Sequence, residues 1–106
     1  MSTVTQLLNA LARHQGRGSG IAAAELARRL DVTPRQLRKL ISAAREDGIA
    51  ICGKPASGYF MPVTAEELHE TCAFLEHRAM HSLRKLSRMK KVALPVLMGQ
   101  LLMNQS

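Results

Sequence analysis

The first fifty residues carry apolar side chains at helical spacing, separated by short polar or glycine-rich breaks. Leucines at one-turn intervals, Leu7 and Leu11 among them, predict a helix over residues 3–14. The glycine-rich segment at residues 15–20 ends this helix. A second, short helix is predicted over residues 23–30, because its two leucines fall on one face.

The third predicted helix, residues 34–47, has a strong start signal. Thr33, Pro34 and Gln36 supply an N-cap residue, a proline at the first helical position and a capping-box partner. The helix is expected to stop at Gly48. One of its faces is apolar and consists of Leu37, Leu40, Ile41 and Ala44.

From residue 49 the periodicity changes to that of extended chain. Residues 49–52 alternate, residues 53–58 are rich in turn-forming Gly, Pro and Ser, and residues 59–61 can return as a second strand. This pattern predicts a small β-hairpin with a basic tip. Because Pro62 closes the hairpin, we expect one domain over residues 1–62.

A long helix is predicted after Pro62. Thr64 and Glu67 form a second capping box, and no helix breaker follows before Pro95. At 1.5 Å per residue a helix from about residue 64 to about residue 90 would be about 39 Å long, more than the preceding domain can cover. A last short apolar helix would start at Pro95. We therefore expect residues 63–106 to form a long helix and a short apolar segment that serve dimerisation.

Apolar or small side chains recur along the long helix at spacings of four and three residues, the seven-residue repeat of a coiled coil. This apolar stripe consists of Leu68, Cys72, Leu75, Ala79, Leu86 and Met89. The opposite arc carries Arg78, His81, Arg84, Lys85, Arg88 and Lys91. Two partners fit the apolar stripe, the chain's own first domain or a second copy, and the length of the helix favours a homodimer.

Charge and composition narrow the function. Fifteen Lys and Arg against eight Asp and Glu give a net charge of +7, which favours a polyanionic partner over a small-molecule substrate. Aromatic residues make up only 3%, which argues against a single-strand binder built on stacked rings. No signal peptide and no membrane-spanning segment are readable, so we expect a cytoplasmic protein that does not contact membranes.

The order of the predicted elements, together with particular residues, gives a family resemblance over residues 5–62. The residues that carry it are Gly20-Ile21-Ala22-Ala23-Ala24-Glu25-Leu26-Ala27, Leu30, Val32, Thr33, Arg35, Leu37, Leu40, Gly48-Ile49 and Gly58-Tyr59. They resemble the winged helix-turn-helix domain at the front of the biotin repressor and of many bacterial regulators. The pattern departs at Ala22, where the family often has a Ser or Thr cap. The resemblance implies a winged helix-turn-helix over these residues. With the long helix predicted after them, the expected fold is mainly α with a small β-hairpin, a winged helix-turn-helix followed by a long C-terminal helix.

The polar face of the third helix is basic and is the predicted DNA-reading surface of a small bacterial or phage-type transcriptional regulator. A helix-turn-helix places such a helix in the major groove of double-stranded DNA, where Arg and Lys can bond guanine and Gln can bond adenine. Threonine at the helix start and the hairpin tip would contact phosphate. The predicted DNA-binding residues are Thr33, Arg35, Gln36, Arg38, Lys39, Ser42, Arg45, Lys54 and Ser57.

Other function classes fit the sequence less well. A basic helix face is often only solvated, and a winged helix can serve as a protein-interaction adaptor in a replication or assembly complex. RNA is disfavoured because its A-form major groove does not admit a helix. No catalytic arrangement points to an enzyme. His77 with His81, and His69 with Cys72, do not make a zinc motif, so no metal or cofactor is expected.

The two cysteines are expected to be structural. Cys72 is interpreted as a small core residue and Cys52 as a strand residue near the hairpin. No disulfide framework is implied by two cysteines in a chain of this kind.

Overall fold

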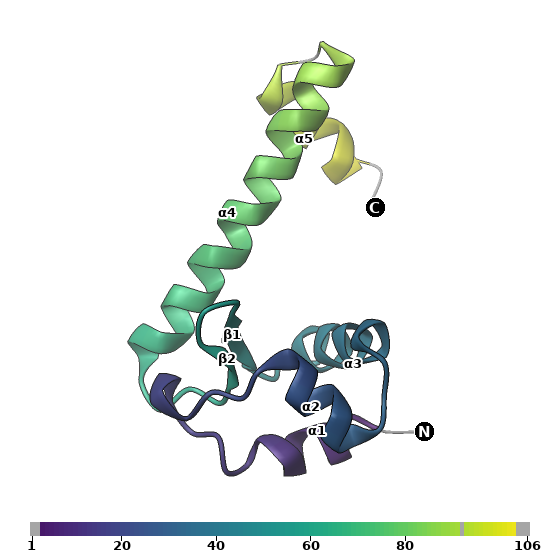
Figure 1. Ribbon diagram of the computed structural model, residues 1–106. Coiled ribbons are helices and arrows are strands. Elements are labelled where there is room, and N and C mark those ends of the chain that lie inside the picture. The colour runs from purple at the N-terminus through teal and green to yellow at the C-terminus, as the bar shows by residue number, and fades with distance from the viewer. Residues whose placement is uncertain (1–2, 92, 104–106) are drawn as a thin grey trace. The chain divides into compact units, whose positions relative to one another are not determined.

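The computed structural model describes residues 3–91 and 93–103. The chain is mainly helical with a small two-stranded antiparallel hairpin, which confirms the predicted fold class at this level (Figure 1). It divides into two units, one that runs to Thr71 and one that starts at Cys72, whereas the sequence placed a boundary after residue 62. The elements are α1 (Val4–Leu11), the 3-10 helix η1 (Arg17–Ser19), α2 (Ala23–Leu30), α3 (Pro34–Glu46), β1 (Cys52–Lys54), β2 (Gly58–Phe60), α4 (Ala65–Lys90) and α5 (Leu94–Met103).

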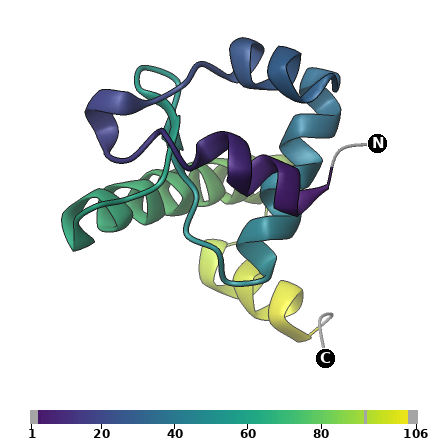
Figure 2. The same cartoon turned by 90° about the horizontal axis from the view of Figure 1, so that it is seen from below.

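The core of the first unit forms where α1, α2 and α3 pack together. These helices lie on one side of the hairpin in both views (Figures 1 and 2). Each contributes the apolar face that its sequence spacing predicted, as the burial of Leu7, Leu26 and Leu37 shows. The remaining buried members of this cluster are Leu11, Ile21, Ala27, Ile41, Ala44 and Ile51.

The hairpin is joined to the helices by extended backbone. β1 and β2 pair in antiparallel register, with Cys52 opposite Phe60. Ile21, just before α2, extends this pairing: its N–H donates to the Tyr59 carbonyl at 2.8 Å, and the Tyr59 N–H donates back to the Ile21 carbonyl at 2.8 Å. Backbone bonds from Gly16 to Met61 and from Met61 to His14 add a second junction.

Two glycines allow the backbone to approach this closely. A Cβ at Gly20 would lie 1.8 Å from the Ser57 carbonyl oxygen. A Cβ at Gly58, where φ is +71°, would lie 2.4 Å from the Ile21 carbonyl oxygen. No other residue fits either position without moving backbone.

Two elements start or end away from their predicted bounds. α1 ends at Leu11, three residues before His14, because the chain turns there and the His14 ring Nδ1 lies 2.7 Å from the Ser19 carbonyl oxygen. β1 begins at Cys52 instead of residue 49. The preceding residues form the exit turn of α3, in which Ile49 N–H donates to the Ala44 carbonyl.

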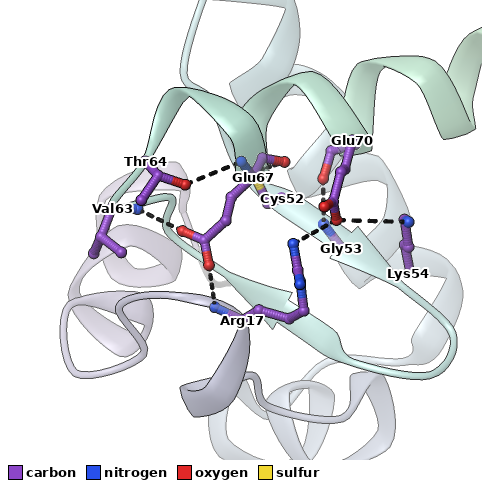
Figure 3. A network of polar contacts seen from close by, with 9 residues as sticks. Arg17, Cys52, Gly53, Lys54, Val63, Thr64, Glu67 and Glu70 are labelled. Carbon is purple, nitrogen blue, oxygen red and sulfur yellow. Dashed lines mark hydrogen bonds and ion pairs between the residues drawn. The ribbon is translucent and has the colours of Figure 1, made fainter.

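The start of α4 is bonded to the first unit (Figure 3). Thr64 caps the helix, since its hydroxyl accepts from the Glu67 N–H at 3.1 Å. The Glu67 carboxylate accepts from the Val63 N–H at 2.9 Å and from the Arg17 N–H at 2.6 Å. The predicted capping box is therefore present in altered form, because Glu67 reaches past the cap residue to Val63 and across to η1.

The next turn of α4 is bonded to β1. The Gly53 N–H donates to the hydroxyl of Thr71, which is 4% exposed, at 3.3 Å. The thiol of Cys52, a buried strand residue as predicted, donates to the Glu67 carbonyl at 3.8 Å. The Glu70 carboxylate pairs with the guanidinium of Arg17 and lies 3.8 Å from Lys54 Nζ. Two turns of α4 thus belong structurally to the first unit.

The second unit contains the rest of α4 and α5. Lys91, at φ 55°, follows the last residue of α4. Leu97 is buried at 2% exposure, and Leu86 is half-buried. Cys72 is exposed, so its interpretation as a core residue is wrong: like its neighbours Leu68 and Leu75 on the same arc of α4, it is left uncovered within the described chain. The large apolar side chains that this unit exposes are Leu75, Met89, Val96, Met98, Leu101, Leu102 and Met103.

We expect Gly20→Ala to lower the free energy of unfolding by about 1–3 kcal/mol, because its methyl group would overlap the Ser57 carbonyl. Urea titration followed by circular dichroism measures this. Gly18→Ala is the matched control, since its Cβ would meet nothing within 4 Å. Equal stability of the two variants would contradict the close approach of residues 20 and 57.

We expect Glu67 to make stability depend on acid pH. Hydrogen bonds from the backbone N–H groups, that of Val63 first and that of Arg17 next, lower the pKa of this carboxyl below 4.5. Its stabilising effect is therefore present above pH 4.5 and is lost as the pH falls through the folded-state value. Urea titrations from about pH 6 to about pH 3 should show a flatter loss of stability in Glu67→Gln. Glu66→Gln, which removes a neighbouring carboxylate outside these contacts, should keep the wild-type profile.

Candidate nucleic-acid interface

α2 and α3 are joined by a tight turn of three residues. Asp31 adopts a left-handed conformation at φ 54°, and its N–H still donates to the end of α2. Val32 N–H donates to the Ala27 carbonyl at 3.0 Å, and Thr33 then caps α3. Because Leu37 and Ile41 are buried in the core of the first unit, the opposite face of α3 remains open.

The open face of α3 is basic. Arg35, Arg38, Lys39 and Ser42 are all exposed. Over residues 3–91 and 93–103, no ion pair or side-chain hydrogen bond engages the three cationic groups. Residues 35, 38, 39 and 42 occupy successive turns, which are about 5.4 Å apart along the axis. The structure thus brings together four of the predicted DNA-binding side chains, and the charges of the three cationic ones are uncompensated.

Arg45 is placed differently from these four. Its side chain is half-buried, and its Nε donates to the Ile51 carbonyl oxygen at 2.9 Å. This bond ties the end of α3 to the chain that enters β1. The guanidinium therefore has a structural partner that sequence spacing did not indicate.

The start of α3 is held by two side chains that were predicted to contact DNA. Thr33 Oγ1 accepts from the Gln36 N–H at 3.1 Å, and Gln36 Oε1 accepts from the Thr33 N–H at 2.8 Å. Reading adenine with both ends of the amide needs this same Oε1. An adenine contact by Gln36 would therefore compete with the cap. The side chains of Arg35, Arg38 and Lys39 take no part in the cap.

The hairpin tip is less positive than its sequence suggests. Lys54 is half-buried, and its Nζ lies 3.8 Å from Glu70 Oε2 (Figure 3). Ser57 is also half-buried, and its N–H closes the turn onto the Lys54 carbonyl at 3.1 Å. Glu70 comes from α4, so the proximity of its carboxylate to Lys54 depends on tertiary structure and leaves no local sequence signal.

The cations of α2 are paired as well. Glu25 forms ion pairs with Arg28 and Arg29 one turn away. The hydrogen bond from Arg28, followed by that from Arg29, lowers the pKa of Glu25, and Glu25 in turn raises the pKa of Arg28. These exposed pairs leave α3 as the helix of the first unit with unpaired cations along its face.

Metal and membrane sites receive no support from the described residues. Among them, no group of three or more His, Cys, Asp or Glu side chains is placed to hold a metal ion. None of the helices in the same residues has the length and apolar character needed to cross a bilayer.

Comparisons of the chain with protein-family models, with curated proteins and with solved structures find no match. The function must therefore be argued from the residues themselves. The exposed basic face of α3, started by a reciprocal cap and backed by a packed core, is the best-defined candidate site in the first unit.

Proposed function

We propose that this chain is a double-stranded DNA-binding protein, a small bacterial or phage-type transcriptional regulator that acts in the cytoplasm. Its first domain would be a winged helix-turn-helix in which α3 reads the major groove. The observation that carries the proposal is the set of exposed, unpaired cations on α3, Arg35, Arg38 and Lys39.

The arrangement of elements supports a winged helix-turn-helix. α2, a three-residue turn and α3 follow one another as in that motif. The antiparallel hairpin comes next and pairs with the extended residue Ile21, which gives the small sheet that carries a wing. An α-helix of about 10–12 Å diameter fits the major groove, which is about 12 Å wide.

The chemistry of the exposed face suits base and phosphate contacts. Arg38 and Lys39 can donate to guanine O6 and N7, and Arg35 lies in the first turn, where helix-turn-helix proteins meet base edges. Lys54 would approach phosphate from the wing, and there a phosphate would compete with Glu70 for its ammonium group. Sequence preference should thus come from α3, and the hairpin should add affinity without preference.

We also propose that the protein binds DNA as a homodimer formed through its second unit. Of the predicted stripe, Leu68, Cys72, Leu75, Ala79 and Met89 are exposed, and Met89 is 81% exposed. A row of exposed apolar side chains along one helix face fits an interaction surface. A two-fold dimer would cover it and would present two α3 helices to a palindromic site.

The alternative is a protein-interaction adaptor, for which the same exposed apolar residues would be the contact surface. The unpaired cations of α3 favour DNA, because an adaptor of this fold would more often bury or neutralise that face. Retention of duplex DNA at low salt separates the two proposals directly.

We expect Arg38→Ala to change which duplex is preferred, at a cost of about 1–3 kcal/mol for the wild-type site, because a bidentate base contact is lost. Lys54→Ala should weaken binding to all sequences alike. Selection of bound duplexes from random DNA, followed by titration at several salt concentrations, measures both effects. The wild-type affinity should fall with salt at a log–log slope of about 0.9 per neutralised phosphate. A flat salt response, or identical behaviour of the two variants, would contradict the proposal.

We expect Leu75→Glu to weaken the homodimer at least about tenfold, because burying a leucine is worth about 1.5–3 kcal/mol. Sedimentation at several protein concentrations measures the dissociation constant. Ala73→Glu is the matched control: it adds the same charge to α4, two residues away and so on the opposite face. A monomeric wild-type protein at tens of micromolar, or equal effects of the two substitutions, would argue against the stripe as a dimer interface.

A further inference from the structure

Most of the net charge of the chain lies in the second unit, outside the site described so far. Up to Thr71 there are nine Lys and Arg against seven Asp and Glu, whereas from Cys72 onward there are six against one, Glu76. The part of α4 after Glu76 contains no acidic residue. Six of its exposed basic side chains share one face, which we call the basic stripe: His77, Arg78, His81, Arg84, Lys85 and Arg88; the exposed Lys90 lies on the opposite arc.

The basic stripe follows one face of the helix. Its members recur at intervals of three and four residues, the spacing that places side chains above one another on an α-helix. From Arg78 to Arg88 the stripe is about 15 Å long at 1.5 Å per residue. Neighbouring charges lie within the Debye length of about 10 Å at 0.1 M salt, so they act together on an approaching anion.

Nothing in the described chain neutralises these charges. The four ion pairs among residues 3–91 and 93–103 all lie before Cys72. Arg78 contacts the ring of Phe74, with its guanidinium 5.9 Å from the ring centroid, which leaves its charge in place. The guanidinium and ammonium groups of the stripe are therefore available to an external anion.

Helix stability does not account for the stripe. A cation in the last turn interacts favourably with the helix dipole, which suits Arg88. The effect fades beyond that turn, so it does not explain Arg78 or Arg84. Cations four residues apart, such as Arg84 and Arg88, repel each other at a cost of about 0.2–0.5 kcal/mol per pair. The arrangement costs the isolated chain free energy, which a bound polyanion would offset.

We propose that the basic stripe of α4 binds the phosphate backbone of duplex DNA, as a second contact surface in addition to α3. The identity of the ligand rests on the proposed function. The stripe contains only Arg, Lys and His side chains, which suits contacts that follow phosphates and carry no sequence information.

Duplex DNA fits the stripe better than an anionic membrane does. A helix that lies on a membrane needs bulky apolar residues opposite its cations. On α4 the opposite arc carries Leu75, Leu86 and Met89, but Ala79 and Ser82 interrupt it and offer little surface to acyl chains. The same arc serves a second copy of the chain in the homodimer that we propose.

The test compares two double variants of the full-length chain. Arg84→Gln/Arg88→Gln removes two charges, and Arg84→Lys/Arg88→Lys keeps them. Titrations of a fixed duplex between about 50 and about 200 mM salt give the slope of affinity against salt. The Gln variant should have a slope smaller by about 2 per bound chain, so that its loss of affinity across this range is smaller by about tenfold for each chain bound. Its sequence preference should be unchanged, and the Lys variant should match the wild type.

Control measurements distinguish a failure of the basic stripe proposal from a failure of the proposal for α3. Circular dichroism and sedimentation should show that the Gln variant keeps its helix content and its oligomeric state. If the wild-type chain binds DNA and the Gln variant has the same salt slope, the proposal for the basic stripe is overturned and the role of α3 is unaffected. If the Gln variant loses the binding of the wild type to phosphatidylcholine vesicles with one third phosphatidylserine but keeps its duplex binding, the stripe is assigned to a membrane and the proposal is overturned. A wild-type chain that retains no duplex at low salt overturns both proposals.

Discussion

The first unit depends on the exchange of two backbone hydrogen bonds between Ile21 and Tyr59. A two-stranded hairpin is marginally stable by itself. Pairing with the segment before α2 adds a third extended segment to the hairpin and joins the hairpin to the helical core. Gly20 and Gly58 permit this approach because they have no side chains to separate the two backbones. The positions of α3 and of the hairpin relative to each other follow from this junction.

The first two turns of α4 complete the same unit. Glu67, Glu70 and Thr71 bond to η1 and to β1, so the hairpin is held both from the α2 side and from α4. This polar network engages three charged side chains whose contacts no local sequence signal indicates: Arg17, Lys54 and Glu70. Its consequence is an uneven charge distribution, in which the hairpin is largely compensated while α3 and the later part of α4 are not.

Much of the architecture could be predicted from local sequence signals. The capping box at Thr33 and the long run without breakers after Pro62 give the bounds of α3 and α4 closely, because both depend on contacts within a few residues. The start of β1 and the exposure of Cys72 were mispredicted. The alternating sequence pattern at residues 49–52 falls mostly in the turn after α3, and burial on α4 depends on what covers each arc.

The candidate site shows the same division. That Arg35, Arg38 and Lys39 share an exposed face follows from helical periodicity and needs no tertiary information. The bond from Arg45 to Ile51 and the proximity of Lys54 to Glu70 join different elements of the fold, so no spacing rule indicates them. Gln36 is an intermediate case. Its capping box can be predicted from the sequence, but its competition with base reading arises because the cap and an adenine contact would use the same oxygen atom, Oε1.

The reciprocal cap of α3 restricts how its surface can be altered, by mutation in nature or by redesign. Positions 35, 38, 39 and 42 are exposed and take no part in the cap. Their residues can therefore be exchanged to suit a different ligand with little loss of folding stability. Residues 33 and 36 hold the helix start, and loss of the threonine alone costs about 1 kcal/mol. A small domain has few kilocalories in reserve. Retargeting of α3 is therefore expected to proceed through these four positions, with residues 33 and 36 kept constant.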